Sequence, residues 1–409
     1  MSLGKLEISD FRRQIESEWM DNIAPFWLKF APDEKYGGFR GLITNDLQID
    51  EKAEKGIILN SRILWTFSHA DKIYREKSYL EIASRAFQYL TKHFFDKDHG
   101  GVFWTVDYTG APLDTKKRPY AQAFALYALS EFYSATNNKS ALDKAFEIFY
   151  LLEKNCQDKQ NKGYFETFER DWTLAKDQRL SEVDANEKKS MNTHLHILEA
   201  YANLYRATGN STVKDRLRAL INIFLDKIIH RKNFYLQMFF DDQWTVKSAV
   251  DSLGHDIEAS WLLWEAAEIL GDEELLKQVQ SVAIKMANAV YDNGLASDGS
   301  LLYEAKNKVI IDRDRDWWVQ AEAVVGFLNA YQLSKDESFL TAAARVWEYI
   351  TEKVIDRSNG EWFWKITDEG LHSNEKPKLS QWKCPYHNGR MCFEAVSRLR
   401  EIEKGLSTK

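Results

Sequence analysis

A sequence pattern that recurs along the whole chain constrains the fold more than any other feature. Each copy has a turn residue, an aromatic-rich stretch of alternating apolar residues, a polar turn and a long apolar segment. Repeating units of this kind cannot bury their apolar faces alone, so neighbouring units must stack. Six copies, spaced 61 to 71 residues apart, account for the chain; they are centred on Gly38, Gly101, Gly163, Phe234, Ser300 and Glu361.

Each copy predicts a short hairpin followed by two helices. A glycine turn and alternating aromatics, as over residues 101–109, predict the hairpin. Apolar residues at helical spacing, as over 121–128, predict the first helix, and an amphipathic second helix follows from about 140 to 152. The first helix of each pair is richer in aromatic and small apolar residues, whereas the second is more charged, which indicates an inner and an outer ring.

These repeats predict an all-α fold, an (α/α)6 barrel of about twelve helices with short β-hairpins at one mouth. A single catalytic domain would cover residues 1–409. The alternative is an open helical solenoid, because stacked helix pairs need not close into a ring.

Composition and charge exclude several classes of protein. The net charge is −7, and the sequence has no stripe of basic residues that could bind nucleic acid. We expect no membrane span, because no stretch approaches 18 consecutive apolar residues, and the N-terminus lacks the apolar run of a signal peptide. The three cysteines form no CxxC pair. We expect a cytoplasmic protein, either a monomer or a weak homodimer, with a small-molecule partner.

Polar and aromatic residues recur where the predicted inner helices begin, and in a ring these positions converge on one mouth. Four of the nine histidines occupy such positions in three of the repeats. Titratable groups at the same register in several repeats indicate a shared site. In chain order the candidates are Arg62, Tyr120, Gln122, Asn192, His194, His196, His255, Glu258, Trp317, Trp318, Glu322, Trp382, Tyr386, His387, Asn388 and Arg390.

Helical spacing separates some of these candidates by face. Asn192 and His196 are four residues apart and share a helix face, so both are predicted to be site residues. His194 points elsewhere and is interpreted as structural. His255 and Glu258 are three residues apart, so the carboxylate could orient the imidazole and set its tautomer.

Two other readings of this pattern concern Glu322 and a metal. Trp318 and Glu322 also share a face, although a core tryptophan beside a solvated glutamate would give the same spacing.

His-x-His and His-x-x-Glu spacings can ligate zinc or iron. No HExxH motif or cysteine cluster accompanies them, and histidines spread around a ring suit acid–base chemistry equally well. We therefore predict a site without a metal.

Long motifs, in the same order along nearly the whole chain, resemble the N-acylglucosamine 2-epimerase superfamily and, within it, the cellobiose 2-epimerases. The resemblance implies an (α/α)6 barrel without a cofactor. It also implies inversion of C2 in the reducing-end glucose of cellobiose and related β-1,4-linked disaccharides. The matching runs are residues 118–122, 191–201, 254–261, 317–322 and 385–391.

The resemblance also implies roles for the catalytic residues. The C2 hydrogen of a closed pyranose is not acidic, so the ring must open first, and histidine can both give and take protons near neutral pH. His255, steadied by Glu258, would assist ring opening, and His387 would remove the C2 proton. Arg62 would then stabilise a cis-enediolate, and His196 would return a proton to the opposite face. The implied substrate-binding residues are Tyr120, Asn192, Trp318, Glu322 and Trp382.

Three other kinds of function remain open, the first of them within the same superfamily. An N-acylglucosamine 2-epimerase or a mannose/glucose aldose–ketose isomerase would share the enediolate intermediate. A glycoside hydrolase on the same barrel would need two carboxylates flanking the scissile bond, for which Glu258 and Glu322 are the candidates. A non-catalytic sugar-binding protein would need only aromatic stacking, and its titratable groups in three repeats would have no role.

Overall fold

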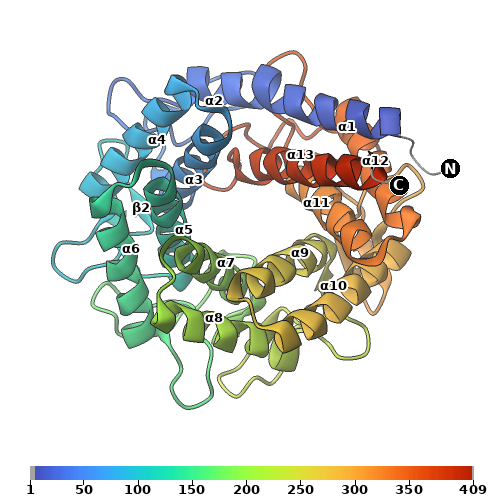
Figure 1. Cartoon of the computed structure of the whole chain (residues 1–409). Helices are drawn as coiled ribbons and strands as arrows, with labels where there is room; N and C mark the ends of the chain where they lie inside the picture. Colours follow the sequence, from blue (N-terminus) through green and yellow to red (C-terminus); the bar gives the residue numbers. More distant parts are fainter. Residues whose placement is uncertain (1–4, 408–409) are drawn as a thin grey trace.

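Two concentric rings of helices form the molecule (Figure 1). The computed structural model describes residues 5–407; the ends of the predicted domain, residues 1–4 and 408–409, lie outside the described residues. The inner ring consists of α3 (Ile57–Tyr74), α5 (Pro119–Thr136), α7 (Met191–Thr208), α9 (Leu253–Leu270), α11 (Trp317–Ser334) and α13 (Tyr386–Ser407). The outer ring consists of α1 (Lys5–Ser17), α2 (Ala24–Phe30), α4 (Lys77–Tyr89), α6 (Lys139–Leu151), α8 (Ser211–Ile223), α10 (Glu273–Gly294) and α12 (Glu337–Tyr349). The predicted (α/α)6 barrel is confirmed.

Burial explains why the two rings differ in sequence. In α5 every residue from Pro119 to Phe132 is buried, and such a helix must be apolar on all sides. The outer helix α4 buries only one stripe, at helical spacing, and leaves its other face polar. No helix within residues 5–407 has the length and apolar character needed to cross a bilayer.

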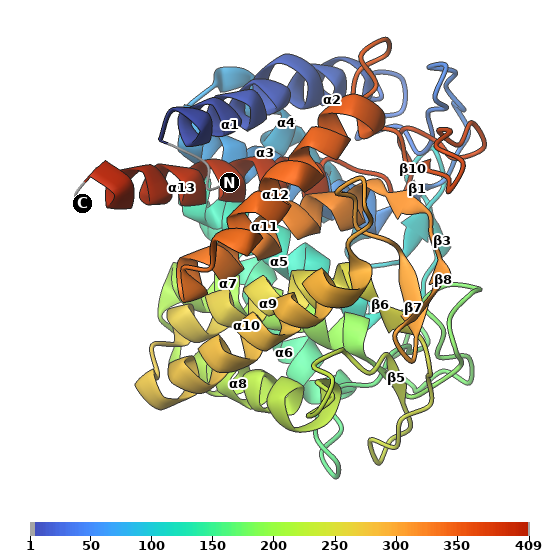
Figure 2. The ribbon, with the colours of Figure 1, turned by 90° about the vertical axis from the view of Figure 1, so that its right-hand side faces the viewer.

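Contacts between the first and last repeats close the ring. The final inner helix, α13, packs against both α11 and α3, and α1 packs along α13. The first and last helices of the described chain, α1 and α13, therefore lie side by side (Figures 1 and 2). These contacts contradict the open solenoid.

Short turns join each inner helix to its outer partner. In repeat two, Asn137 adopts a left-handed conformation at the end of α5, and the side chain of Asn138 accepts a hydrogen bond from the Ala141 amide at the start of α6. Several outer helices then end in, or continue through, a short π-helical segment. These segments are η1 (Glu18–Ile23), η2 (Leu90–Phe94), η3 (Leu152–Cys156), η4 (Phe224–Ile228) and η5 (Ile350–Val354).

Short antiparallel strands gather at one mouth of the barrel, as predicted (Figure 2). Four of them, β1, β4, β6 and β9, run directly into inner helices, so they fix where those helices begin. The sheets pair β1–β2–β3, β4–β5, β6–β7–β8 and β9–β10. Their bounds are β1 (Lys55–Gly56), β2 (Thr105–Val106), β3 (Pro112–Asp114), β4 (Lys189–Ser190), β5 (Phe239–Phe240), β6 (Asp251–Ser252), β7 (Glu304–Lys306), β8 (Val309–Asp312), β9 (Arg315–Asp316) and β10 (Lys365–Ile366).

The hairpin predicted over residues 101–109 lies further along the chain. The strand pair is β2 with β3, and its turn covers residues 107–111. Gly100 and Gly101 have φ values of 72° and 69°, so they close a separate turn back to Asp96 at the end of the outer helix. The glycines thus mark the turn before the hairpin.

Candidate active site

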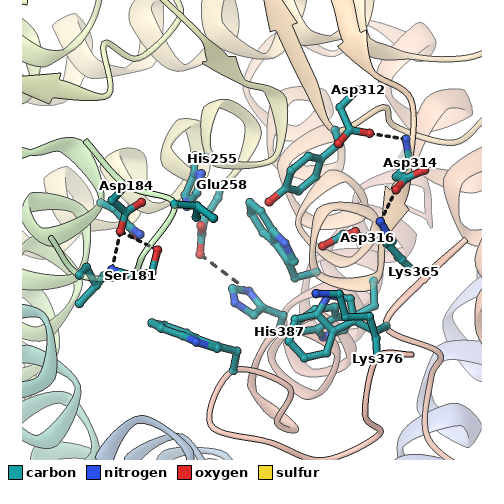
Figure 3. Close-up of a pocket in the computed structure, with 18 of the residues that line it drawn as sticks. Ser181, Asp184, His255, Glu258, Asp312, Asp314, Asp316, Lys365, Lys376 and His387 are labelled. Atoms are coloured by element: carbon teal, nitrogen blue, oxygen red, sulfur yellow. Dashed lines mark hydrogen bonds and ion pairs between the residues drawn. The ribbon is translucent and has the colours of Figure 1, made fainter. Parts of the chain in front are cut away.

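A cavity of about 440 Å³ opens at the strand-bearing mouth, where the inner helices begin. It is lined by side chains from the first two turns of these helices and by the loops above them (Figure 3). The structure therefore brings together residues from all six repeats. Nine of the ten predicted site residues line the cavity: Arg62, Tyr120, Asn192, His196, His255, Glu258, Trp318, Trp382 and His387.

Glu322, the tenth predicted site residue, has a different position from the one expected. Its Oε1 lies 2.7 Å from Nδ1 of His387, and its Oε2 accepts a hydrogen bond of 3.0 Å from the Trp261 indole. The carboxylate is thus buried behind the imidazole, outside the cavity lining. Glu322 thus contacts His387 and does not line the cavity, which differs from the position expected of a substrate-binding residue.

His196 has the same kind of carboxylate partner. Its Nδ1 lies 3.1 Å from Oε2 of Glu199, one helical turn further along α7. The sequence analysis did not select Glu199, although its spacing of three residues from His196 was a usable signal. In both histidines a carboxylate fixes Nδ1, which leaves Nε2 as the ring nitrogen that can serve a molecule in the cavity.

The predicted pairing of His255 with Glu258 is not present. Nδ1 of His255 lies 2.7 Å from the Ser252 hydroxyl, at the N-terminal end of α9. Glu258 instead lies beside His387, with its Oε1 3.9 Å from Nδ1 (Figure 3). It also accepts a hydrogen bond of 2.6 Å from Arg390. The buried guanidinium charge draws the carboxylate toward α13 and away from His255.

Arg62 presents a positive charge to the cavity without a carboxylate of the described chain in direct contact with it. Its Nη2 donates to the Tyr120 hydroxyl at 3.1 Å, and its guanidinium stacks over the Phe124 ring at 4.3 Å. Among the described residues, no carboxylate forms an ion pair with it. An anion in the cavity could therefore use this charge fully.

Arg390 lies at the centre of the buried charges behind the histidines. It was a candidate from the sequence, but no role was assigned to it. Its Nη2 donates to Glu258 at 2.6 Å and to Glu322 at 2.7 Å, while its Nη1 contacts Glu199 and the Tyr386 hydroxyl. The guanidinium is 2% exposed, so these contacts are shielded from solvent.

One group of residues could in principle bind a metal. Ligand atoms of Glu258, Glu322 and His387 lie within 4.8 Å of one another. Arg390 already contacts both carboxylates through one nitrogen, so a guanidinium occupies the place of a cation. The donor set therefore fits an organic cation better than a metal ion.

Burial controls the protonation of the cavity residues. It lowers the pKa of His196, lowers that of His387 well below its usual value and lowers that of His255 to about 4. Burial also raises the pKa of Glu258 and Glu322. Burial alone would raise the pKa of Glu199 as well, but Arg390 and His196 hold it at about 2.

His194 lies outside the cavity lining, in agreement with its structural interpretation. Its Nδ1 pairs with the Ser190 carbonyl at 2.7 Å, and its Nε2 accepts a hydrogen bond from the Tyr164 amide at 2.9 Å. Nδ1 is thus used at the start of α7, and Nε2 holds the turn that contains Tyr164 against this helix.

Loops at the mouth supply cavity residues that the sequence analysis missed. On one side, Asp184 accepts hydrogen bonds from the amide and hydroxyl of Ser181 at 2.8 and 2.9 Å (Figure 3). On the other side, Lys365 pairs with Asp314, and burial raises the pKa of Asp316 to about 7. These residues lie in loops and short strands without helical periodicity, so they could not be selected by their position in a predicted helix.

Comparison with known proteins agrees with this geometry. The sequence profile of the N-acylglucosamine 2-epimerase family matches residues 37–388. The cellobiose 2-epimerase of Bacteroides fragilis is 46% identical over 94% of this chain and 98% of its own length, and that of Ruminococcus albus is 44% identical over 94% and 98%. The structure of cellobiose 2-epimerase from Bacillus thermoamylovorans superimposes with a TM-score of 0.92 at 40% identity, covering 95% of this chain and 100% of that one. The chain belongs to the N-acylglucosamine 2-epimerase family.

Proposed function

We propose that this protein inverts C2 of the reducing-end glucose in cellobiose and related β-1,4-linked disaccharides, giving glucosyl-mannose. One observation carries the proposal: His196 and His387, from α7 and α13, line one cavity, and each has a carboxylate on Nδ1. Two such imidazoles are what an epimerase needs, because one must remove a proton from a carbon and the other must return one.

Ring opening comes first and is assigned to His255. Its Nδ1 is engaged by Ser252, which leaves Nε2 for the sugar's anomeric hydroxyl or ring oxygen. Its pKa of about 4 keeps the imidazole neutral near pH 7, so Nε2 can accept the proton of the anomeric hydroxyl and return it to the ring oxygen as the C1–O5 bond breaks and the aldehyde forms.

Proton abstraction at C2 follows and is assigned to His387. The C2–H bond breaks, the proton moves to Nε2, and the electron pair enters a cis-enediolate. Glu322 on Nδ1 stabilises the imidazolium that forms. Arg62, free of a carboxylate partner among the described residues, stabilises the negative charge on the enediolate oxygen, and Asn192 adds a hydrogen bond.

Return of a proton to the other face of C2 completes the reaction and is assigned to His196. Its imidazole reaches the cavity from α7, whereas His387 reaches it from α13. A donor on a separate helix can approach C2 from a different direction from the abstracting base, which inversion requires.

The length of the cavity favours a disaccharide over a monosaccharide. Beyond the histidines it continues to the loop with Ser181 and Asp184 on one side and to Asp312, Asp314 and Lys365 on the other (Figure 3). These polar groups can hold a second sugar, while Trp318 and Trp382 offer aromatic faces to the rings. The cellobiose 2-epimerases matched over nearly the whole chain support the same substrate class.

Hydrolysis fits the carboxylates poorly. Glu258 and Glu322 both bind Nη2 of Arg390, so they lie together on one side of His387. A hydrolase needs its two carboxylates on opposite sides of the scissile bond.

Incubation with cellobiose in D2O, followed by NMR, tests the proposal. We expect glucosyl-mannose that carries deuterium at C2, because the proton that His196 delivers has exchanged with the solvent. Free glucose would indicate hydrolysis, and a ketose product would indicate isomerisation. Parallel incubations with mannose and N-acetylglucosamine test the two related activities, and faster turnover of either one than of cellobiose would overturn the substrate assignment.

A further inference from the structure

The two arms of the Arg390 guanidinium serve different histidines. Nη1 contacts Glu199, the carboxylate on His196. Nη2 donates to Glu322, the carboxylate on His387, at 2.7 Å. A continuous chain of hydrogen bonds therefore runs from His196 through Arg390 to His387.

This chain is buried and held rigidly. His196, Glu199, Arg390, Glu322 and His387 are each at most 6% exposed. The guanidinium lies over the Tyr386 ring at 4.3 Å and the Trp261 ring at 4.7 Å, which fixes its plane. Charges in such surroundings interact strongly because little water screens them.

Counting the charges shows how many protons the cluster favours. Three carboxylates face two guanidiniums, so with both imidazoles neutral the ionised groups carry one net negative charge; these groups are Glu199, Glu258, Glu322, Arg62 and Arg390. One added proton balances the cluster, whereas a second would leave an unpaired buried positive charge.

We propose that Arg390 is a positioning residue that couples the two imidazoles, so that the cluster keeps one proton which either His196 or His387 can carry. The catalytic consequence rests on the proposed epimerase function. After one turnover His387 has gained the C2 proton and His196 has given one, so the protonation pattern is reversed. Because the same cation contacts the carboxylates of both histidines, the cluster keeps its single proton in either pattern, and the site can run in both directions.

Burial raises the pKa of Glu258 and Glu322, but each carboxylate accepts a hydrogen bond from Arg390, which favours its ionised form. The other ionisable groups around the cluster do not supply this proton. Burial raises the pKa of the Tyr120, Tyr127 and Tyr386 hydroxyls, so the three phenols on α5 and α13 stay neutral. His255 on α9, with its pKa of about 4, is also neutral near pH 7. Arg62 on α3 stays charged throughout.

The substitution Arg390→Gln tests the coupling, with Arg398→Gln as the matched control. Arg398 lies on the same helix and bonds Asn329 and Gln332, away from the cavity. ¹⁵N NMR of labelled histidine, assigned with His196→Gln and His387→Gln, follows each imidazole without substrate. In Arg390→Gln we expect both imidazoles to titrate about one pH unit higher, because a nearby cation opposing both protonations is gone. In the control neither should move.

A merely structural role for Arg390 gives a different result. It would lower the melting temperature and kcat in Arg390→Gln while leaving one or both titrations in place, and that outcome in folded protein would overturn the coupling. The pH profile of kcat offers a second readout, since both of its limbs should move to higher pH.

Glu199→Gln provides the test if Arg390→Gln does not fold. Glu199 contacts His196 directly but reaches His387 only through Arg390. Coupling predicts that His387 also titrates at lower pH in this variant; an unchanged His387 would overturn it. The titrations need no turnover, so they can succeed even if cellobiose is not epimerised, and failure of the proposed function is thereby distinguished from failure of the coupling.

Discussion

His196 and His387 have matching surroundings at the level of single residues. Each ring is buried, each has a glutamate on Nδ1, and each lines the cavity. Matching surroundings suit a reaction whose two directions exchange the roles of acid and base. The proposed assignment therefore makes a prediction for each histidine separately.

Replacing each histidine with alanine should separate the two proton transfers. With cellobiose in D2O, His387→Ala should abolish exchange at C2, because no group abstracts the proton. His196→Ala should stop formation of glucosyl-mannose but retain C2 exchange in cellobiose, because abstraction and return on one face still occur. NMR measures both, and each loss should be on the order of 10² to 10⁴-fold.

His194→Gln is the control for these variants. The ring nitrogens of His194 bond the Ser190 carbonyl and the Tyr164 amide, and the residue does not line the cavity, so exchange and turnover should both persist. Exchange lost in His196→Ala and retained in His387→Ala would reverse the two assignments.

The sequence predicted the histidines of the site better than their partners. Recurrence at one register marked His196, His255 and His387, because repeat position determines which mouth a residue faces. The partners lie in other repeats: Arg390 meets Glu199 across 191 positions of the chain. Spacing along one helix reports a shared face and carries no information on such contacts, which is why Glu258 was paired with the wrong histidine.

At the level of elements, one kind of contact fixes the turn that follows an outer helix to the next inner helix. In four repeats the fourth residue of the inner helix accepts a hydrogen bond from a backbone amide before the helix. The acceptor can be an amide, an imidazole or a carboxyl group. The pairs are Gln122 with Val102, His194 with Tyr164, Asp256 with Leu236, and Gln320 with Leu301.

Asp256→Asn should therefore stabilise the protein. Oδ1 of Asp256 accepts from the Leu236 amide at 2.6 Å, while Oδ2 has no hydrogen-bond partner in the described part of the chain. Burial raises the pKa of Asp256 well above its usual value, so the fold favours the protonated carboxyl group. The unfolded chain releases that proton above about pH 4, and the cost to the fold grows with pH.

Thermal unfolding between pH 5 and 8 measures this effect. The gain in melting temperature from Asp256→Asn should increase with pH, since asparagine needs no proton. Asp292→Asn, exposed on α10, should change little at any pH. A lower melting temperature for Asp256→Asn at pH 8 would show that the carboxyl group is satisfied in a way that asparagine cannot reproduce.

Helices were easier to predict than strands for a physical reason. In α5 the fourteen residues from Pro119 to Phe132 are all buried, and such a long, mostly apolar run is easy to recognise in the sequence. The strands are two to four residues long, too short to show alternation, so the glycines before β2 were mistaken for the hairpin itself.

At the scale of the whole molecule, the site exists only when the ring is closed. Every inner helix packs between two inner neighbours, including α13 between α11 and α3. The cavity takes residues from all six repeats, so separation of α13 from α3 would part His387 from Arg62. In an open array each repeat depends on its neighbours alone, and end repeats can unfold first; a closed ring has no end.

Closure predicts that the barrel unfolds as one unit despite its 409 residues. Urea titrations followed by far-UV circular dichroism, tryptophan fluorescence and turnover of cellobiose should share one midpoint. Leu340→Ala places a cavity in the outer helix α12, where Leu340 is 1% exposed, and should cost about 2–5 kcal/mol. Because the ring transmits this loss to every repeat, all three midpoints should fall together. If activity kept its midpoint while circular dichroism lost part of its amplitude earlier, the α12 repeat would be unfolding alone, and the ring would be a chain of independent units.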